Sequence, residues 1–349
     1  MSTRNLTAVE GLRFFLFLGI FVFHCVSHWF PIGWGGVEAF LVIGAYFLTS
    51  KYLKREQSDV AVDEAFVGRI KRLYPAYIIL IIAAVAMVTV YSHQIKGDAL
   101  WYLFSLQNFR CLFDGNWNSL ESYLGHFWYI GLDVWLFLLW VVLMRLVPKK
   151  NLKKAFVATL CVGLLWRTIF VIFRPDNPSL SYVIPVGLLD CWSVGGLVAI
   201  NFNETGKNNC LEWTEIIVGA IGILALIGYN AVLNHCGIAE AYQLFHTAKG
   251  YMLNPITGNI HLFIALLAAG VLRYCLDTTK KHPVLSWTPL VALGGMTYEL
   301  YCFHLPILSF TRHYIHNSLL TLIVALLVTY VVSLLWCRLA MPVIYKIIK

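Results

Sequence analysis

Residues 11–30 read GLRFFLFLGIFVFHCVSHWF, an apolar stretch long enough to cross a lipid bilayer as one α-helix. A crossing needs about 20 mostly apolar residues. Ten stretches meet this requirement, at roughly 11–29, 33–50, 73–92, 127–147, 155–173, 182–200, 213–232, 255–274, 287–310 and 319–340. We expect helices, because the runs are too long and too continuous for the strands of a membrane barrel. The sequence thus predicts an all-α polytopic integral membrane protein with about ten transmembrane helices.

The overall composition supports this prediction. Of the 349 residues, 59% are hydrophobic and only 13% are charged, whereas soluble domains carry about 25% charged residues. This composition excludes a soluble globular enzyme, a disordered chain and a coiled coil. Neither a repeat of fixed period nor a low-complexity linker is present, so we expect one membrane domain over residues 1–349. No appended extracytoplasmic domain is expected.

The positions of Lys and Arg predict the orientation. With the N-terminus inside, 19 of the 26 fall in the inner segments, and Arg13 and Arg167 lie within spans. Only a few fall in the outer loops, namely Lys96, Arg110, Arg174, Lys249 and Arg312. Cytoplasmic loops carry an excess of Lys and Arg, so both termini are expected in the cytoplasm. The net charge of +8 is then a sign of topology, and nucleic-acid binding is not expected.

His24 and Glu38 are ionisable residues inside the first two expected spans, where such residues are costly and often functional. Each is seven residues from Pro31, the centre of the turn between these spans, so an antiparallel hairpin would place both at similar depth. A carboxylate beside an imidazole can fix its tautomer, as in acyl-transfer sites. A purely structural pair is the alternative. His28, one turn after His24, has no third ligand nearby in sequence, so we expect no metal site.

A short basic segment, RIKRLYPAY, precedes the third expected span. Arg69 and Arg72 are three residues apart and share one helix face, and Lys71 adds a third cation. One interpretation is an ordinary topology signal. The other is a phosphate clamp, because arginine binds phosphate through two parallel hydrogen bonds. With no glycine-rich phosphate loop in the sequence, side-chain charge would have to hold such a ligand.

Aromatic and acidic residues mark the long outer loop, about 93–126, and the span that follows it. Residues 99–113 of this loop are expected to lie in the interface or to re-enter the membrane. His126, Trp128 and Tyr129 suit an aromatic belt at the outer interface. Asp133 lies deeper and needs a partner, either structural or a substrate.

The ninth expected span contains Glu299 and His304, and Pro306 permits a kink. These two residues suit either a proton relay or a network that holds helices together. Arg13, near the inner end of the first span, could snorkel to lipid phosphates. We expect structural roles for Arg167, Asp190 and His261.

Several motifs occur in an order that resembles the bacterial acyltransferase family three, membrane O-acyltransferases that acetylate surface glycans. They are GLR with a histidine after ten intervening residues, GGVEAFLVIGAYFLT, RIKRLYPAY, LFSLQNF, HFWYIGLD and GGMTYELYCFHLPIL. The resemblance covers nearly the whole chain. The Arg13–His24 spacing and the Arg69–Arg72 pair are its most specific parts. Glu38 stands where the family usually has Asp, Asp133 where it commonly has Glu, and Gly44-Ala45 where it has Ser-Gly.

The resemblance implies a bacterial inner-membrane enzyme that uses acetyl-CoA as acyl donor and no metal. Arg69, Lys71 and Arg72 would hold the phosphates of the donor, and its pantetheine arm would pass Arg13. His24, oriented by Glu38, would act as general base or carry the acyl group. The acceptor would be a glycan or lipid-linked saccharide reached from outside. Its expected contacts are Asn108, Trp128, Tyr129, Asp133, Glu299 and His304.

Three points stay open. The acceptor could be an O-antigen, an exopolysaccharide, peptidoglycan or another envelope sugar. Transfer could be direct or pass through an acyl-enzyme. A proton-coupled transporter or flippase of an envelope glycan is the alternative function, although the hairpin with His24 and Glu38 is not repeated in the second half, as transporters with inverted repeats would suggest.

Overall fold

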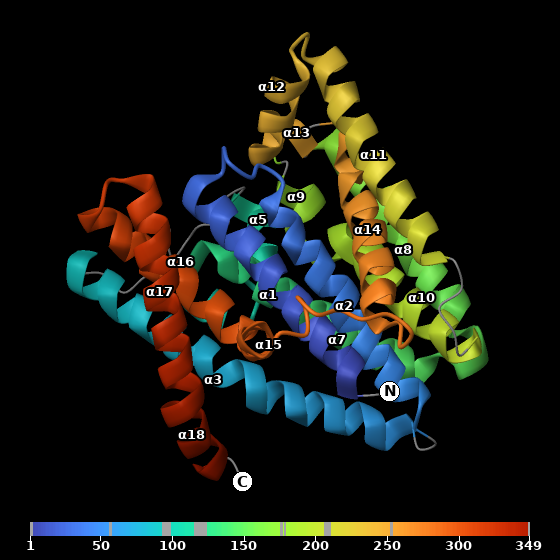
Figure 1. Cartoon of the computed structure of the whole chain (residues 1–349), viewed down its shortest axis with the longest axis horizontal. Helices are drawn as coiled ribbons and strands as arrows, with labels where there is room; N and C mark the ends of the chain where they lie inside the picture. The colour runs from blue at the N-terminus through green and yellow to red at the C-terminus, as the bar shows by residue number, and fades with distance from the viewer. Residues whose placement is uncertain are drawn as a thin grey trace.

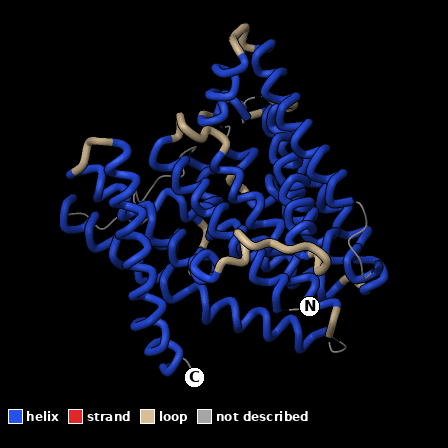
Figure 2. Tube along the Cα trace, viewed as in Figure 1, coloured by secondary structure: helices blue, strands red, loops and turns tan. Residues whose placement is uncertain are grey.

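The computed structural model describes residues 3–55, 58–92, 99–114, 124–174, 177, 179–205, 211–251 and 254–347. All regular structure within these ranges is helical (Figures 1 and 2). The long helices are α1 (Thr3–Val26), α2 (Gly36–Leu53), α3 (Ser58–Ser92), α7 (Trp128–Leu146), α8 (Leu152–Phe173), α10 (Leu189–Thr205), α11 (Leu211–Leu233), α14 (Ile260–Leu276), α16 (Thr297–Tyr314) and α17 (Ser318–Leu335). The short helices are α4 (Ala99–Leu103), α5 (Gln107–Asp114), α9 (Ser179–Tyr182), α12 (Ile238–Gln243), α13 (Ala248–Tyr251), α15 (Thr288–Gly295) and α18 (Met341–Ile347).

Eight helical stretches among the described residues are long and apolar enough to cross a membrane. They contain α1, α3, α7, α8, α10, α11, α14 and α17. The other two expected spans, 33–50 and 287–310, are helical but more polar. The first is α2, and the second is divided at Met296 into α15 and α16. The all-α polytopic class is therefore confirmed. Two of the ten expected stretches are not long and apolar enough to be recognised as membrane spans by themselves.

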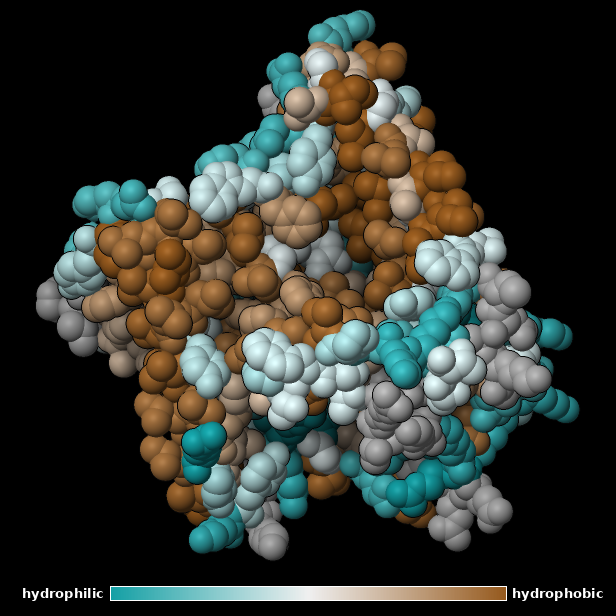
Figure 3. Space-filling view, in the orientation of Figure 1, coloured by the Kyte–Doolittle hydropathy of each residue, from teal (hydrophilic) through white to brown (hydrophobic). Residues whose placement is uncertain are grey.

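The outer surface of the molecule fits a membrane. Figure 3 shows hydrophobic side chains over the middle of the visible face, with hydrophilic ones mainly toward its upper and lower ends. Large apolar side chains of α8, α11 and α17 are among the exposed ones, for example Leu165, Leu224 and Leu327. α1 begins and α18 ends in the lower half of Figure 1, as the expected common side of both termini requires.

Glycines allow the central helices to approach closely. A Cβ atom on Gly195 of α10 would collide with the backbone carbonyl oxygen of Val42 in α2, and one on Gly219 of α11 would lie 2.6 Å from the Leu267 nitrogen of α14. Small residues at helix interfaces are typical of membrane bundles, because association there depends on close packing. α2 therefore packs against α10, α14 and α1 in the interior.

The described part of the long outer loop folds into the protein. Tyr102, Gln107 and Asn108 are buried, and the Tyr77 hydroxyl of α3 donates a hydrogen bond to the Tyr102 carbonyl oxygen at 2.5 Å. The end of this loop, residues 115–123, lies outside the described residues. α4 and α5 thus pack against α3 and α7 through these buried residues, while Leu100 and Phe104 remain exposed.

Candidate active site

Three histidines from distant parts of the chain meet near the end of α1. The ring centre of His24 lies 5.3 Å from that of His304 in α16, which lies 4.8 Å from that of His126. His126 belongs to a short turn of helix, η2 (Gly125–Phe127), directly before α7. Phe17 and Phe21 of α1 contact His304 from the other side, with ring centres 5.9 and 6.1 Å away. The histidines are thus enclosed by aromatic rings.

Pro306 explains why His126 lies here. Proline has no backbone N–H, so the carbonyl oxygen four residues earlier, that of Cys302, loses its helical partner. His126 Nε2 lies 3.2 Å from this oxygen and replaces the missing donor. In the same turn, His304 Nδ1 lies 2.6 Å from the Tyr301 carbonyl oxygen. The kinked helix therefore holds both imidazoles.

These two contacts determine the tautomers. A ring nitrogen facing a carbonyl oxygen must carry the proton, so the other nitrogen of a neutral imidazole carries a lone pair. Within the described residues, His304 Nε2 and His126 Nδ1 are buried with no hydrogen-bond partner. His304 therefore presents a basic nitrogen in the cluster with His24. No group of described side chains is arranged to hold a metal ion.

Aromatic and charged groups extend from the histidines toward the N-terminal half of α1. The Tyr301 hydroxyl donates to the His126 carbonyl oxygen at 2.7 Å, and the Tyr301 ring centre lies 5.4 Å from that of Tyr129. Tyr129 in turn lies within electrostatic range of Arg13. The structure therefore connects the histidine cluster to Arg13 through two tyrosines.

Arg13 and Arg72 interact electrostatically, and both act on the buried Glu299. The Arg13 guanidinium also donates to Glu10 at 2.8 Å. Arg72 is exposed, and among the described residues its one hydrogen bond is a long one, 3.5 Å to the Gly295 carbonyl oxygen. Lys71 is partly exposed. A cationic group thus lies on the far side of the tyrosines from His24.

Arg69 has a partner of its own. Its guanidinium forms an ion pair with Asp133 of α7 and lies over the Phe137 ring, 4.8 Å from the ring centre. About a fifth of the Arg69 side chain is exposed. Arg69 and Arg72 share a helix face as expected, but Arg69 reaches into the bundle, where Asp133 neutralises it.

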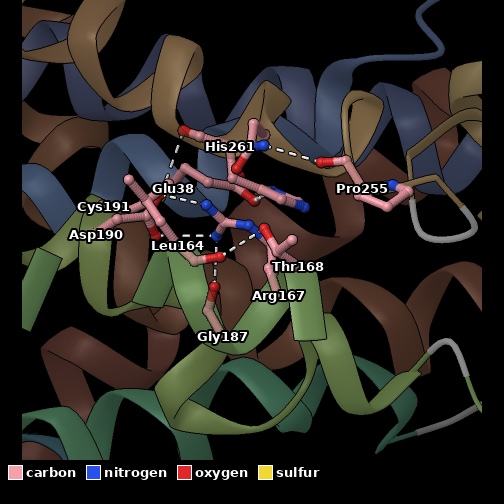
Figure 4. Close-up of polar contacts among 10 residues, drawn as sticks. Glu38, Leu164, Arg167, Thr168, Gly187, Asp190, Cys191, Pro255 and His261 are labelled. Carbon is pink, nitrogen blue, oxygen red and sulfur yellow. Dashed lines mark hydrogen bonds and ion pairs between the residues drawn. The ribbon is translucent and has the colours of Figure 1, made fainter. Parts of the chain in front are cut away.

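The predicted pair of Glu38 with His24 is wrong. Glu38 Oε1 lies 2.8 Å from Nδ1 of His261 in α14, and both side chains are buried. Two residues at similar depth in a helical hairpin can still have side chains that point in different directions around their helix axes. His24 faces α16, whereas Glu38 faces α14 (Figure 4). Glu38 therefore cannot orient His24 in this arrangement.

Arg167 and Asp190 form a second buried pair near Glu38. Two guanidinium nitrogens of Arg167 donate to the two carboxylate oxygens of Asp190, at 2.9 and 2.5 Å. Arg167 also donates to the Gly187 carbonyl oxygen at 2.5 Å (Figure 4). The expected structural roles of Arg167, Asp190 and His261 agree with these contacts, which join α8 to α10 and α14 to α2.

Two predicted acceptor contacts have structural partners. The Asn108 side-chain nitrogen donates to the carbonyl oxygens of Trp128 and Val183, at 2.8 and 2.7 Å, and the side chain is buried. The Trp128 ring packs against Tyr182 with centres 4.7 Å apart. These contacts hold α5, α7 and the segment before α10 together. Tyr129, Glu299 and His304 instead lie along the line from Arg13 to His24.

His126 and Tyr301 are site residues that sequence reasoning missed, and for His126 the reason is that an aromatic belt explained it equally well. The available signal was Pro306, which leaves one helical carbonyl in need of a donor. The partner of Glu38 was missed for another reason. His261 is more than two hundred residues away in sequence, and nothing local distinguishes it from other histidines.

The chain is similar to several known proteins. It is 25% identical to the putative peptidoglycan O-acetyltransferase YrhL of Bacillus subtilis, over 87% of this chain and 49% of that protein. It is 24% identical to the O-acetyltransferase OatA of Staphylococcus aureus, over 100% of this chain and 57% of OatA. The peptidoglycan O-acetyltransferase OatA of Listeria monocytogenes is 24% identical, over 89% of this chain and 50% of that protein.

The chain therefore spans about half the length of the curated relatives it matches. No solved structure matches it. The family described as an acyltransferase domain matches residues 6–340, nearly all of the sequence. The match extends over the histidine cluster, the cationic group and every long helix of the bundle. This chain belongs to the acyltransferase family three.

Proposed function

We propose that the protein is a membrane O-acetyltransferase that transfers an acetyl group from cytoplasmic acetyl-CoA to a hydroxyl group of an extracytoplasmic or lipid-linked glycan. One observation carries this proposal. The groups needed for donor binding and for proton transfer form one continuous series of neighbouring side chains. It runs from Arg72 and Arg13 through Tyr129 and Tyr301 to His304 and His24. The names of the relatives support peptidoglycan as the acceptor.

The cationic group would bind the phosphates of the donor. Arg72 is exposed and, in the part of the chain that the structure describes, makes only one long hydrogen bond, so its guanidinium is open to a ligand. Arg13 lies between Arg72 and the tyrosines and would meet the pantetheine arm. Lys71 adds charge at the entrance. Arg69 could join through the guanidinium nitrogens that do not bond to Asp133, or by exchanging Asp133 for a phosphate.

The histidine cluster would carry out the transfer. The acceptor oxygen attacks the thioester carbonyl carbon, and His24 takes the hydroxyl proton as general base. The C–S bond then breaks, and the sulfur of CoA leaves as the thiol with that proton. His304 Nε2 replaces Glu38 as the group that can accept the N–H of His24 and stabilise its charged form. In the alternative order of steps, His24 first takes the acetyl group from the thioester as a covalent acetyl-imidazole, and the acceptor hydroxyl then receives it.

The test compares variants of the purified protein in lipid vesicles with radiolabelled acetyl-CoA and soluble peptidoglycan fragments. Transfer of label and release of CoA are both measured. His24→Ala should abolish transfer, while His28→Ala, an exposed histidine one turn later, should retain it. Equal transfer by the wild type and His24→Ala would refute the proposed site.

A second measurement separates the two orders of steps. Ping-pong kinetics, with label retained on the protein before acceptor is added, would establish the acyl-enzyme. If the wild type neither releases CoA nor transfers label to any envelope glycan, the acyltransferase proposal fails. The transporter alternative would then be tested by glycan movement across the same vesicles.

A further inference from the structure

A polar pocket lies at the end of α1 that carries His24. Its volume is about 200 Å³, and its lining residues are Cys25, Arg312, Ile315, His316, Ser318 and Thr321. These residues come from the last turn of α1, the end of α16, the connection after it and the start of α17. The pocket is therefore on the opposite side of His24 from Arg13 and Arg72.

Arg312 joins this pocket to the histidine cluster. One guanidinium nitrogen, Nη2, donates to the carbonyl oxygens of His24 and Cys25, at 2.5 and 2.7 Å. Within the described residues, Arg312 has no carboxylate partner, since these carbonyl groups are its only hydrogen-bond partners. Arginine has five N–H donors, so most of its donors remain available while the side chain is held in place.

The start of α17 adds to the positive potential. This helix has 18 residues and no acidic residue in its first turn. Its N-terminal end carries the positive pole of the helix dipole, which favours anions. The Asn317 side chain caps it by accepting from the Leu320 nitrogen at 2.9 Å, and Ser318 follows at the pocket wall. His316 supplies a further donor.

We propose that this pocket binds an anionic group of the acceptor, a carboxylate or a phosphate, and thereby positions a nearby hydroxyl at His24. The inference rests on the proposed function and specifies its acceptor as anionic. Three features converge on the pocket. They are the Arg312 guanidinium, which among the described residues has no carboxylate partner, the His316 side chain and the N-terminal end of α17. Because Arg312 contacts the backbone of His24 itself, a group bound here lies beside the reacting imidazole.

Peptidoglycan and a phospholipid share this chemistry. The muramic acid of peptidoglycan carries a free lactyl carboxylate where no stem peptide is attached, a lipid-linked precursor carries a pyrophosphate, and membrane lipids carry phosphate. The proposal assigns the site to the acceptor. A phospholipid headgroup as the natural occupant is therefore a contrary outcome, and the experiment must distinguish the two.

The first measurement detects binding without enzymatic activity. The full-length protein in phosphatidylcholine vesicles is treated with phenylglyoxal, and modification of Arg312 is followed by mass spectrometry. A muramic-acid-containing tetrasaccharide and pyrophosphate should slow this modification at least about threefold, while the neutral chitin tetrasaccharide should not. Absence of protection by the charged saccharide overturns the proposal. Protection only in phosphatidylglycerol vesicles assigns the pocket to lipid and also overturns it.

The second measurement uses matched variants. Losing a hydrogen bond to a charged group costs about 1.5–3 kcal/mol, or roughly 10- to 150-fold in binding. Arg312→Gln should therefore raise the KM for the charged saccharide at least about tenfold, with no change in the KM for acetyl-CoA. His316→Gln should raise it less, and His313→Gln, an exposed neighbour outside the pocket, should not raise it.

Arg312 also holds the end of α1, so Arg312→Lys is included as a variant that retains the charge. If the KM of Arg312→Lys for the charged saccharide lies between those of the wild type and Arg312→Gln, the result supports an electrostatic role of Arg312. An equal rise in KM for the charged and the neutral saccharide would indicate a purely structural role and overturn the proposal. If neither the wild type nor any variant transfers acetyl, the proposed function fails. Protection of Arg312 from phenylglyoxal would still measure anion binding in the pocket.

Discussion

The contact of Glu38 with His261 makes a quantitative prediction about coupling. Both side chains are buried and 2.8 Å apart. Hydrogen bonds between membrane helices have coupling energies of about 0.6 kcal/mol on average and about 1.7 kcal/mol at most. Because this bond involves a carboxyl group with 0% exposed area, we expect a value near the upper end, about 1–2 kcal/mol.

The measurement is a double-mutant cycle on the free energy of unfolding in detergent. It uses Glu38→Gln, His261→Asn and the double variant, and a second cycle replaces His261→Asn with His24→Asn. The first cycle should show the stated coupling. The second should be additive within about 0.5 kcal/mol, as is usual for residues with no shared partner. Clear coupling of Glu38 to His24, with none to His261, would refute the orientation of α2 described above.

The same variants separate positioning from chemistry. If Glu38 supports only the bundle, Glu38→Gln lowers stability but leaves the pH dependence of kcat unchanged. A shift of the pH profile of kcat in Glu38→Gln would return Glu38 to the catalytic machinery.

Three further predictions concern the site and the packing. His304→Gln should lower kcat about 100-fold or more, because a positioned acid or base contributes roughly that much, and an unchanged kcat in the acetyl-transfer assay would exclude His304. Arg72→Ala should raise the KM for acetyl-CoA about tenfold while Arg72→Lys retains most of the affinity, and a change in kcat alone would contradict a phosphate contact. Gly195→Ala should destabilise the protein by about 1–3 kcal/mol, because its Cβ meets the Val42 carbonyl oxygen. Gly44→Ala, with open space around it, serves as the control in thermal unfolding.

The fold could be predicted from the sequence because a bilayer constrains span length and hydrophobicity so strongly. The weakest predictions were α2 and the segment 287–310. Glu38 and Lys51 lower the hydropathy of α2, and Met296 interrupts the other segment between α15 and α16. α2 packs on other helices in the interior and so needs less apolar surface, and much of α16 is buried as well, whereas α15 is largely exposed.

The site was only partly predictable. Spacing along one helix predicts depth, and the eleven residues from Arg13 to His24 in α1 correspond to a rise of about 16 Å. It does not predict which neighbouring helix a side chain faces, and the partner of Glu38 was therefore wrong. Arg69 was expected to contact the donor and Asp133 the acceptor, whereas the two residues form an ion pair with each other. Such partners depend on how helices rotate against one another, which a single sequence does not reveal.

The distribution of charge suggests how one protein can serve two anionic ligands on opposite sides of a membrane. Arg72 and Arg13 lie on one side of the histidine cluster and Arg312 on the other, with the tyrosine and phenylalanine rings between them. Moving a charged phosphate through such a ring-lined region would be very costly. On the proposed function, the acetyl group and the pantetheine arm that carries it are uncharged, so they can enter the ring-lined region at low cost. Each cationic end therefore retains its own anionic group, and the uncharged centre admits only the neutral acetyl end of the donor and the acceptor hydroxyl.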